Sequence, residues 1–377
     1  MYATKPLSLF KSHPEAASQP PPEGWSSGYL VVKRPDDDGD DEMCCWGTCG
    51  GSRVRDLPFP QNSVLKVRYT EHHSDRDTTY SDAVVFVPVP DQPLASNRYY
   101  VVVATGMYKG LVRVCSREED MTTFCFYRRI NDAMPRPFNP ADVYQQVEIV
   151  QRRRGRFTAR SVAADGFPFF LYRKKYWRVY ASKTKHFGLG EAPGLNAALR
   201  SRQLAGANNF PLDAFPATTT PPPPTAVGKW YTPFFLIKET GVALAEQMDR
   251  AMFYEVSLEQ RWEPEHGDGF GKLDGKSVLI GGSVEGKQEA SAGERHGDGY
   301  VWFRAVAGQR VGVSASLWER MLWEEYRGGW VDEHGEAGKL AAGGSVLVER
   351  FAVKRADGSV AVAVDFVHFN KVRETQV

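Results

Sequence analysis

The chain has 377 residues, of which 42% are apolar, 12% are aromatic and 25% are charged. This composition argues against a disordered chain, and the length exceeds the size at which single hydrophobic cores usually stop growing. The first residues hold no sustained apolar core, and no apolar run approaches the about 20 residues of a membrane span. We therefore expect a cytoplasmic protein of two domains without a signal peptide or transmembrane segment, with the nucleus as a second allowed compartment.

Charge is unevenly distributed along the chain. Residues 1–205 hold 29 Lys and Arg against 22 Asp and Glu, whereas residues 206–377 hold 18 against 24. Residues 98–205 carry the positive excess, with 20 cationic against 8 acidic side chains. The formal charge of +1 for the whole chain therefore hides a basic half followed by an acidic half.

Four regions are predicted in chain order. Residues 1–28 are rich in Pro and Ser and are predicted to be an extended N-terminal lead-in outside the core. A basic β-rich domain follows over 29–205. A linker over 206–228 contains Pro221–Pro224, which favours a semi-rigid polyproline spacer. An acidic β-rich domain with a C-terminal hairpin occupies 229–377.

Short runs of β-branched and aromatic residues, each bounded by turn residues, predict an antiparallel sheet in the first domain. The predicted strands are Gly28–Lys33, Val64–Tyr69, Ala83–Val87, Tyr99–Ala104, Leu111–Cys115, Phe124–Tyr127, Arg156–Val162 and Phe169–Tyr180. A helix over about Leu195–Leu204 is predicted to close this domain. With 24 prolines and 35 glycines, the chain favours short elements, so the expected fold is a strand-dominated α+β protein with a few short helices.

In the second domain, a helix is predicted over Val242–Ala251. The apolar period then changes to two, which predicts a strand over Tyr254–Trp262. Ser316 and Glu319 have the spacing of a capping box and predict that a second helix begins there and runs to Arg327.

The C-terminus gives the clearest local prediction. Val346–Arg355 and Val360–Phe369 flank Asp357-Gly358, a dipeptide typical of a type I′ hairpin turn. The resulting cross-strand pairs are Val353 with Val362, Phe351 with Val364, Glu349 with Phe366 and Leu347 with His368. His368 then lies on the apolar face, where we interpret it as structural rather than catalytic.

The cysteines and histidines do not form a complete metal site in the sequence. Cys44, Cys45 and Cys49 have irregular spacing and no nearby histidine, whereas zinc needs four ligands. We interpret the cluster as a structural turn with reduced thiols; a surface thiol group and a lipid attachment point are the alternatives. The segment 72–77 and the acidic run 36–42 are interpreted as solvated loops, and no metal or cofactor is predicted.

A repeated tetrapeptide is the one candidate for acid–base chemistry. His-Gly-Asp-Gly occurs twice and places His266 near Asp268 and His296 near Asp298. Imidazole titrates near neutral pH, but Asp-Gly is also typical of turns, and no nucleophile is tied to either copy. Motifs for dinucleotide, P-loop, zinc-protease and serine-hydrolase sites are absent, so no catalytic residue is predicted.

Basic charge gives the stronger binding signal. Two clusters on predicted strands could form a patch for phosphate groups, of anionic lipid first and of nucleic acid second. Their residues are Arg152, Arg153, Arg154, Arg156, Arg173, Lys174, Lys175 and Arg178. The alternative is that the acidic domain or a protein partner meets this excess of charge.

Ordered blocks along nearly the whole chain resemble one family. They are Pro6–Phe10, Pro20–Gly24, Ser27–Val31, Cys44–Gly47, Val87–Pro90, Pro93–Tyr100, Cys115–Asp120, Asp165–Pro168, Lys229–Phe234, Met252–Trp262 and Gly328–Val331. Together they resemble a plant family catalogued as domain of unknown function 1262. The resemblance implies a land-plant protein and transfers no catalytic residue.

The expected function is therefore that of a non-enzymatic intracellular interaction protein with an unidentified protein partner, in plant stress or defence responses. One alternative is a module that binds anionic lipid or nucleic acid through the basic 152–178 surface. The other is an enzyme of unfamiliar type that uses the two His-Gly-Asp-Gly loops.

Overall fold

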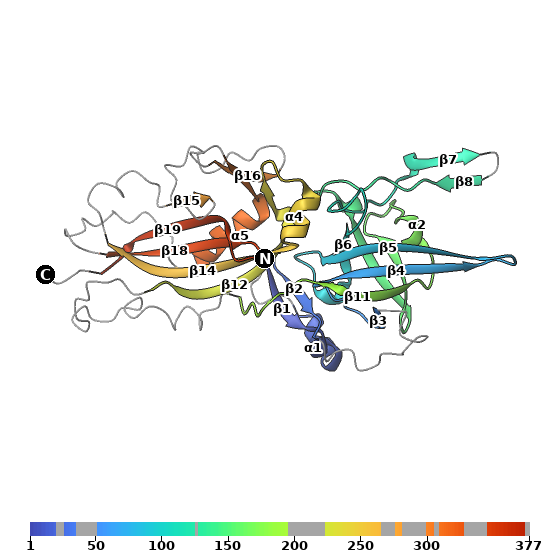
Figure 1. Ribbon diagram of the computed structural model, residues 1–377, viewed down its shortest axis with the longest axis horizontal. Coiled ribbons are helices and arrows are strands. Elements are labelled where there is room, and N and C mark those ends of the chain that lie inside the picture. The colour runs from blue at the N-terminus through green and yellow to red at the C-terminus, as the bar shows by residue number, and fades with distance from the viewer. Residues whose placement is uncertain are drawn as a thin grey trace. The chain divides into compact units, whose positions relative to one another are not determined.

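Strands dominate the fold of this chain, which Figure 1 shows as a computed structural model. Short helices accompany several antiparallel sheets, which confirms the predicted α+β class. None of the helices in the described ranges has the length and apolar character needed to cross a membrane. The structure describes residues 1–19, 26–34, 51–124, 127–194, 223–264, 276–280, 299–304, 309–327 and 345–373.

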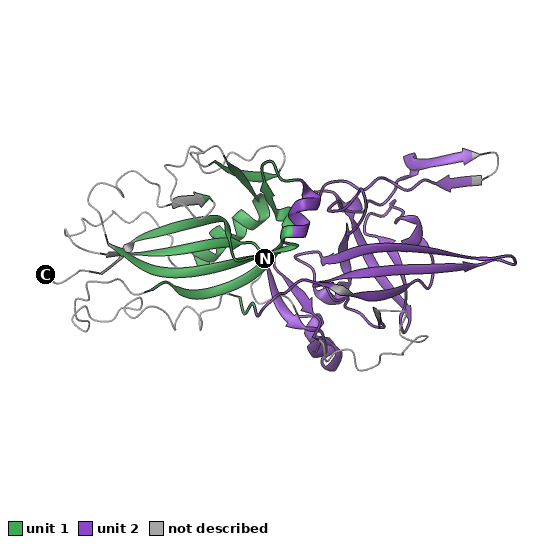
Figure 2. Ribbon diagram, in the orientation of Figure 1, with its two compact units in different colours: residues 1, 192–242, 250–377 green, residues 2–191, 243–249 purple. Residues whose placement is uncertain are grey.

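The chain divides into two compact units (Figure 2). Unit 2 comprises residues 2–191 and 243–249, and unit 1 comprises residue 1, 192–242 and 250–377. Residues 195–222 lie outside the described residues, and with them the predicted helix over 195–204 and most of the predicted linker. The predicted domain boundaries at 205 and 229 therefore stay predictions.

Unit 2 is built on a sheet of seven strands that curls round an aromatic core. In spatial order they are β10 (Arg156–Ser161), β9 (Gln146–Arg153), β6 (Arg98–Val103), β5 (Asp77–Pro88), β4 (Ser63–His72), β11 (Arg178–His186) and β3 (Gly51–Val54). Phe157 N of β10 donates a hydrogen bond to Trp177 O, just before β11, at 3.0 Å. Strand β10, at one edge of the sheet, thus contacts the segment before β11 on the opposite side. The interior is filled by fully buried aromatic side chains: Phe59, Phe86, Tyr99, Phe157 and Trp177.

The N-terminal residues differ from the extended lead-in predicted for 1–28. Strand β1 (Tyr2–Pro6) pairs in parallel with β2 (Gly28–Val32), and helix α1 (Leu7–Ser12) follows β1 directly. Their apolar side chains form a cluster of their own with Leu94. The prediction of an extended lead-in was based on the Pro and Ser content of this segment. Its structure is instead determined by its apolar side chains, which pack into this cluster.

Three predicted strands of unit 2 are replaced by other structure. Residues 111–115 form only isolated bridges through Val112. The run predicted over 124–127 is not one strand, because Phe124 ends β7 (Met121–Phe124) and Tyr127 begins β8 (Tyr127–Ile130), and the two residues pair in a separate hairpin. The long run predicted from Phe169 begins instead with the short helix α2 (Phe170–Arg173). β-propensity measures how well a side chain suits a half-buried surface. Aromatic and β-branched residues also occupy such surfaces in loops and short helices, so these runs were predicted as strands.

Unit 1 combines two antiparallel sheets with a helix. The larger contains β15 (Lys276–Ile280), β19 (Val360–Arg373), β18 (Ser345–Lys354), β14 (Phe253–Pro264) and β12 (Thr225–Pro233). The smaller contains β13 (Ile237–Glu239), β17 (Arg310–Ser314) and β16 (Tyr300–Arg304), and the second predicted helix appears as α5 (Ala315–Arg327). The first predicted helix appears as α4 (Leu244–Arg250), and all of it except Arg250 belongs to unit 2. Short 3-10 helices at Pro14–Ala17, Leu94–Ser96, Glu118–Asp120, Val143–Gln145 and Phe234–Leu236 complete the two units.

Helix α5 packs on one face of the larger sheet. The ring of Trp318 lies 5.5 Å from that of Phe303 and 6.3 Å from that of Phe366, between centroids. The helix begins two residues earlier than its predicted capping box, because Ser314 Oγ accepts a hydrogen bond from Leu317 N at 3.2 Å. Ser314 therefore caps the helix in the place predicted for Ser316.

The C-terminal hairpin confirms all four predicted cross-strand pairs, including Leu347 with His368. The turn type was wrong. A type I′ turn needs positive φ at both central residues, whereas here Gly358 has φ 83° and Asp357 is not left-handed. Gly358 N donates to Arg355 O at 2.9 Å, so the loop is a type I turn followed by a left-handed glycine.

Four buried tyrosines are expected to make unit 2 less stable at alkaline pH. Burial raises the pKa of Tyr100 to about 12 and that of Tyr2, Tyr99 and Tyr172 further. The unfolded chain ionises near pH 10, so this contribution is fully present below pH 10 and is lost as the pH rises towards the folded values. We expect the free energy of unfolding to fall above about pH 10 in urea titrations.

A matched pair of variants tests this alkaline loss. Tyr172→Phe should reduce it, since its hydroxyl donates to Asp82 Oδ2 at 3.1 Å inside unit 2. Tyr326→Phe should leave it unchanged, because Tyr326 is 68% exposed. An identical alkaline dependence in wild type and Tyr172→Phe would contradict the assignment.

Candidate anion-binding site

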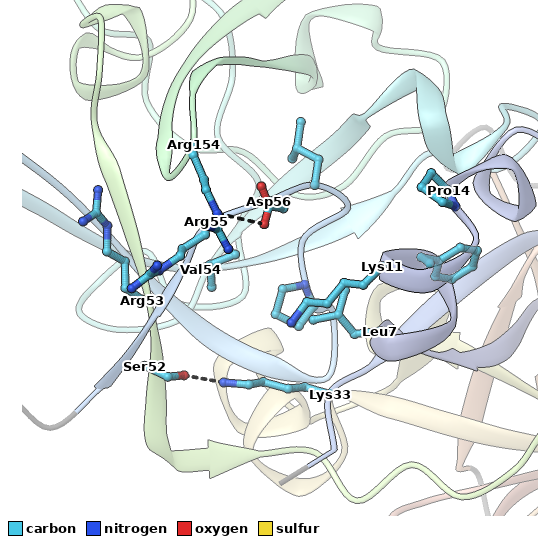
Figure 3. A pocket seen from close by; sticks show the side chains of 13 residues that line it. Leu7, Lys11, Pro14, Lys33, Ser52, Arg53, Val54, Arg55, Asp56 and Arg154 are labelled. Carbon is cyan, nitrogen blue, oxygen red and sulfur yellow. Dashed lines mark hydrogen bonds and ion pairs between the residues drawn. The ribbon is translucent and has the colours of Figure 1, made fainter. Parts of the chain in front are cut away.

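A pocket of about 590 Å³ lies in unit 2 (Figure 3). Four segments build its wall: α1 with Pro14 just after it, the residue after β2, strand β3 with the residues after it, and the β9–β10 turn. Its apolar part consists of Leu7, Phe10, Pro14, Val54, Leu57 and Pro60. The volume is within the about 300–1,000 Å³ that is typical of small-molecule sites.

The polar part of the wall is strongly basic. Five lining side chains are cationic and one is acidic, a formal balance of +4. Arg154 Nε lies 3.8 Å from Asp56 Oδ2, with both side chains well exposed, so this ion pair contributes little. The cationic residues are Lys11, Lys33, Arg53, Arg55 and Arg154, and the acidic one is Asp56.

Arg53 is held in a fixed position at the pocket. Its Nη2 donates to Gly155 O at 3.2 Å, while its Nε is buried without an acceptor among the described residues. Gly155 has φ 67°, and a methyl group there would lie 3.1 Å from the Arg53 guanidinium. Glycine is therefore required both by the turn and by the approach of Arg53, which keeps one N–H group unsatisfied.

Arg53 also joins a second group of arginines outside the pocket. Burial lowers the pKa of Arg156, and the positive charges of Arg178, Arg53 and Arg153 lower it further. Arg178 Nε, like Arg53 Nε, is buried without a hydrogen-bond partner in the described structure. None of the four forms an ion pair with a carboxylate of the described residues. The pocket and this group share Arg53 and have Asp56 as their one acidic residue; together we call them the basic surface.

The structure divides each predicted basic cluster. From the first, Arg153, Arg154 and Arg156 belong to the basic surface, while Arg152 is exposed on β9 and does not line the pocket. From the second, Arg178 belongs to it.

The rest of the second cluster is engaged elsewhere in unit 2. Arg173 Nη2 lies 3.2 Å from Asp132 Oδ1, and Lys174 pairs with Glu71. Lys175 is exposed and does not line the pocket. Local sequence could not show these partners, because they are about 40 and about 100 residues away along the chain. We therefore exclude these three from the candidate site.

Half of the cationic side chains of the basic surface were not predicted from the sequence. Lys11 lies in the predicted lead-in and Lys33 follows it closely. Arg53 and Arg55 are only two cations, too few to be recognised as a basic cluster. The available signal was the alternation Arg53-Val54-Arg55, which in extended backbone places two cations on one side of the chain.

Several predicted candidates lie outside the described residues. They are His266, Asp268, His296 and Asp298 of the repeated tetrapeptide and Cys44, Cys45 and Cys49. Of the described side chains, only one group of His, Cys, Asp and Glu converges closely enough to hold a metal ion, in unit 1: Glu325, Glu349 and His368.

That group has strongly shifted acid–base properties. Burial and the neighbouring Glu349 carboxylate raise the pKa of Glu325 to about 8. Burial opposes the charged form of His368, but the Glu325 and Glu349 carboxylates outweigh it and raise the pKa of His368 to about 9. The sequence predicted the position of His368 and missed Glu325, which α5 contributes.

By its fold and its basic surface, this is a strand-rich protein with a candidate anion-binding site. Residues 23–126 match the model of a family described as "Protein of unknown function (DUF1262)". This confirms the family resemblance in that part of the chain, and the match contains Lys33, Arg53 and Arg55 of the pocket.

Other comparisons add little. No curated protein matches the sequence. Among solved structures, the chain is similar to one described as "Crystal structure of Cry35Ab1", with 10% identity and a TM-score of 0.42. The match covers 83% of this chain and 89% of that chain. A likeness of this level carries no conclusion about function.

Proposed function

We propose that this protein acts by binding rather than by catalysis, and that its basic surface binds a compact organic anion that carries phosphate groups. The observation that carries the proposal is the convergence of five cationic side chains on one pocket with a single acidic neighbour. Guanidinium groups suit phosphate oxygens because their planar N–H forks bind two oxygens at once.

The shape of the pocket favours a small ligand over an extended one. An apolar wall stands beside the cations, so a ligand with both phosphate groups and carbon surface fits better than a nucleic-acid backbone. The buried Nε group of Arg53, which lines the pocket, would gain an acceptor when an anion binds. We further propose that the protein has a protein partner, that it is intracellular, and that it acts in plant stress or defence responses.

Titration with inositol hexakisphosphate tests the proposal on the full chain by calorimetry. We expect binding that weakens steeply as salt is added, because exposed charges are screened within about 10 Å at 0.1 M salt. The double variant Arg53→Gln/Arg154→Gln should lower the affinity at least about tenfold, the effect of losing about 1.4 kcal/mol of charged hydrogen bonding.

The control removes the same charge elsewhere in unit 2. Arg128→Gln/Arg129→Gln lies on exposed β8 and should leave the affinity within about twofold. Equal losses in both double variants would show that net charge, and not the pocket, binds the anion. Parallel sedimentation with phosphatidylserine vesicles separates a lipid headgroup from a free phosphate compound as the source of the anion.

A further inference from the structure

The core of unit 1 contains a buried polar cluster, which we define as Gln260, Glu325, Glu349 and His368. Three of these residues have no exposed surface, and His368 is 3% exposed. Ionisable side chains are rarely buried to this extent unless an opposite charge or a bound cation compensates them. The basic surface of unit 2 does not involve this cluster, so it needs an explanation of its own.

Three neighbouring strands and one helix bring the cluster together. Gln260 of β14 lies opposite Glu349 of β18. His368 of β19 stands two residues after Phe366, the partner of Glu349. Side chains two residues apart on a strand share a face, so all three point to the side of the sheet that α5 covers. Glu325 reaches the same point from α5.

The distances within the cluster fit one metal ion. His368 Nε2 lies 3.2 Å from Glu325 Oε2 and 3.3 Å from Glu349 Oε2. One donor atom from each of these residues lies within 4.8 Å of the others. Zinc in a tetrahedral site has bonds of about 2.0–2.2 Å, which places neighbouring donor atoms about 3.3–3.6 Å apart. Small shifts of the side chains would therefore complete three bonds to a central ion.

Gln260 provides a fourth oxygen. Its Nε2 donates to Glu349 Oε1, which fixes the amide next to the carboxylate. Its Oε1 is fully buried and accepts no hydrogen bond from the described residues. A buried carbonyl oxygen without a donor is costly, and a cation bound beside Glu349 would satisfy it.

Charge balance leads to the same site. Glu324, the neighbour of Glu325, pairs with Arg320 on α5. A divalent ion would balance the charges of the Glu325 and Glu349 carboxylates, and His368 would bind it as a neutral imidazole. We propose that the buried polar cluster binds one divalent transition-metal ion, and that its donor set of one imidazole, two carboxylates and one amide favours Zn²⁺. The ion would join β14, β18, β19 and α5 at one point of the core.

Metal content of the full chain tests this proposal. We expect wild type, unfolded in urea with a chelator and refolded with Zn²⁺, to retain about one zinc per chain after gel filtration by mass spectrometry. Its Tm should be higher than that of protein refolded without metal. Refolding with Co²⁺ should give the visible absorption of a tetrahedral site.

Variants locate the ion. His368→Gln and, as a second variant, Glu325→Gln should lose the zinc and the cobalt absorption, with refolding checked by circular dichroism. The matched control is His72→Gln, because exposed His72 also lies beside a carboxylate, with Nδ1 2.8 Å from Asp77 Oδ1. Wild type that refolds without zinc, with a Tm unaffected by Zn²⁺, would overturn the proposal and leave two protons as the source of charge balance. Zinc retained by folded Glu325→Gln and His368→Gln would overturn it equally.

Discussion

Phe59→Ala is expected to destabilise unit 2 by about 3–5 kcal/mol, the usual cost of removing a large buried aromatic side chain. Phe59 has no exposed surface. Its ring centroid lies 4.9 Å from those of Phe86 and Phe157, 6.0 Å from Tyr99 and 6.3 Å from Trp177. Phe86, Tyr99 and Phe157 come from three different strands, so the surrounding sheet cannot collapse into the cavity without separating its own strands.

Urea unfolding followed by tryptophan fluorescence and circular dichroism measures this loss. Phe59→Leu retains most of the apolar volume and should cost clearly less than the alanine variant. The same substitution also tests the pocket, because neighbouring Leu57 and Pro60 line it. Anion binding should therefore weaken in Phe59→Ala at temperatures where unit 2 remains folded. A loss below about 1 kcal/mol would show that Phe59 is not central to the core.

Local sequence patterns predicted the elements whose partners are close along the chain. The hairpin of β18 and β19 is set by period-two alternation and a glycine turn, so its register, including His368 opposite Leu347, followed from the sequence. The turn type did not follow, because Asp357-Gly358 also suits a type I turn with a left-handed glycine.

The candidate sites depend on contacts that no local pattern encodes. The basic clusters predicted an excess of charge, but Lys174 is engaged by Glu71 and Arg53 enters from a distant strand. In unit 1, the inward position of Glu349 was visible in the predicted register. Its meeting with Glu325 required the docking of α5 on the sheet, which depends on the tertiary packing of both elements.

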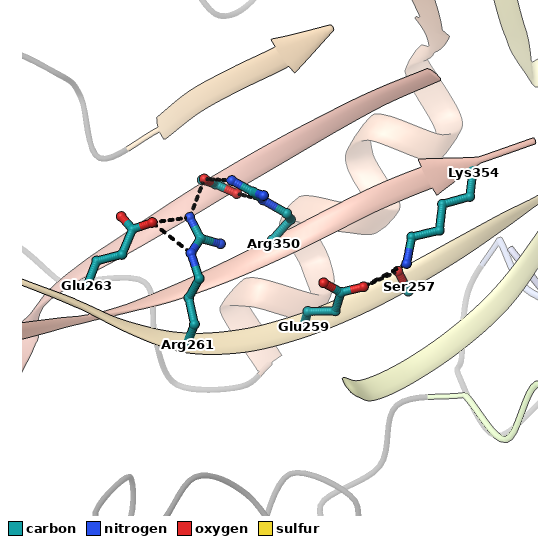
Figure 4. Close-up of polar contacts among 7 residues, drawn as sticks. Ser257, Glu259, Arg261, Glu263, Arg350 and Lys354 are labelled. Atoms are coloured by element: carbon teal, nitrogen blue, oxygen red, sulfur yellow. Dashed lines mark hydrogen bonds and ion pairs between the residues drawn. The ribbon is translucent and has the colours of Figure 1, made fainter. Parts of the chain in front are cut away.

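Asp365→Ala is expected to destabilise unit 1 by about 3 kcal/mol, as removal of one partner from a buried ion pair does. The Asp365 carboxylate is buried and accepts hydrogen bonds from Arg350 Nε and Nη2 and from Arg261 Nη2, each at 2.7 Å. It thus joins β14, β18 and β19 on the face opposite α5, where Figure 4 shows Arg350 and Arg261 side by side. Without it, Arg261 keeps Glu263, but Arg350 loses both of its hydrogen bonds.

The measurement is urea unfolding at low and high salt, with hydrogen exchange of the β18 and β19 amides to assign the change to unit 1. Lys354→Ala on the same face is the comparison, because the Lys354–Glu259 pair at 2.8 Å is a single contact that water reaches more easily. It should cost at most about 1 kcal/mol. The Asp365 effect should persist at high salt, since buried charges are poorly screened. Equal, salt-sensitive losses for both variants would mean that this face of the sheet is held by ordinary surface ion pairs, and that its apolar side alone stabilises unit 1.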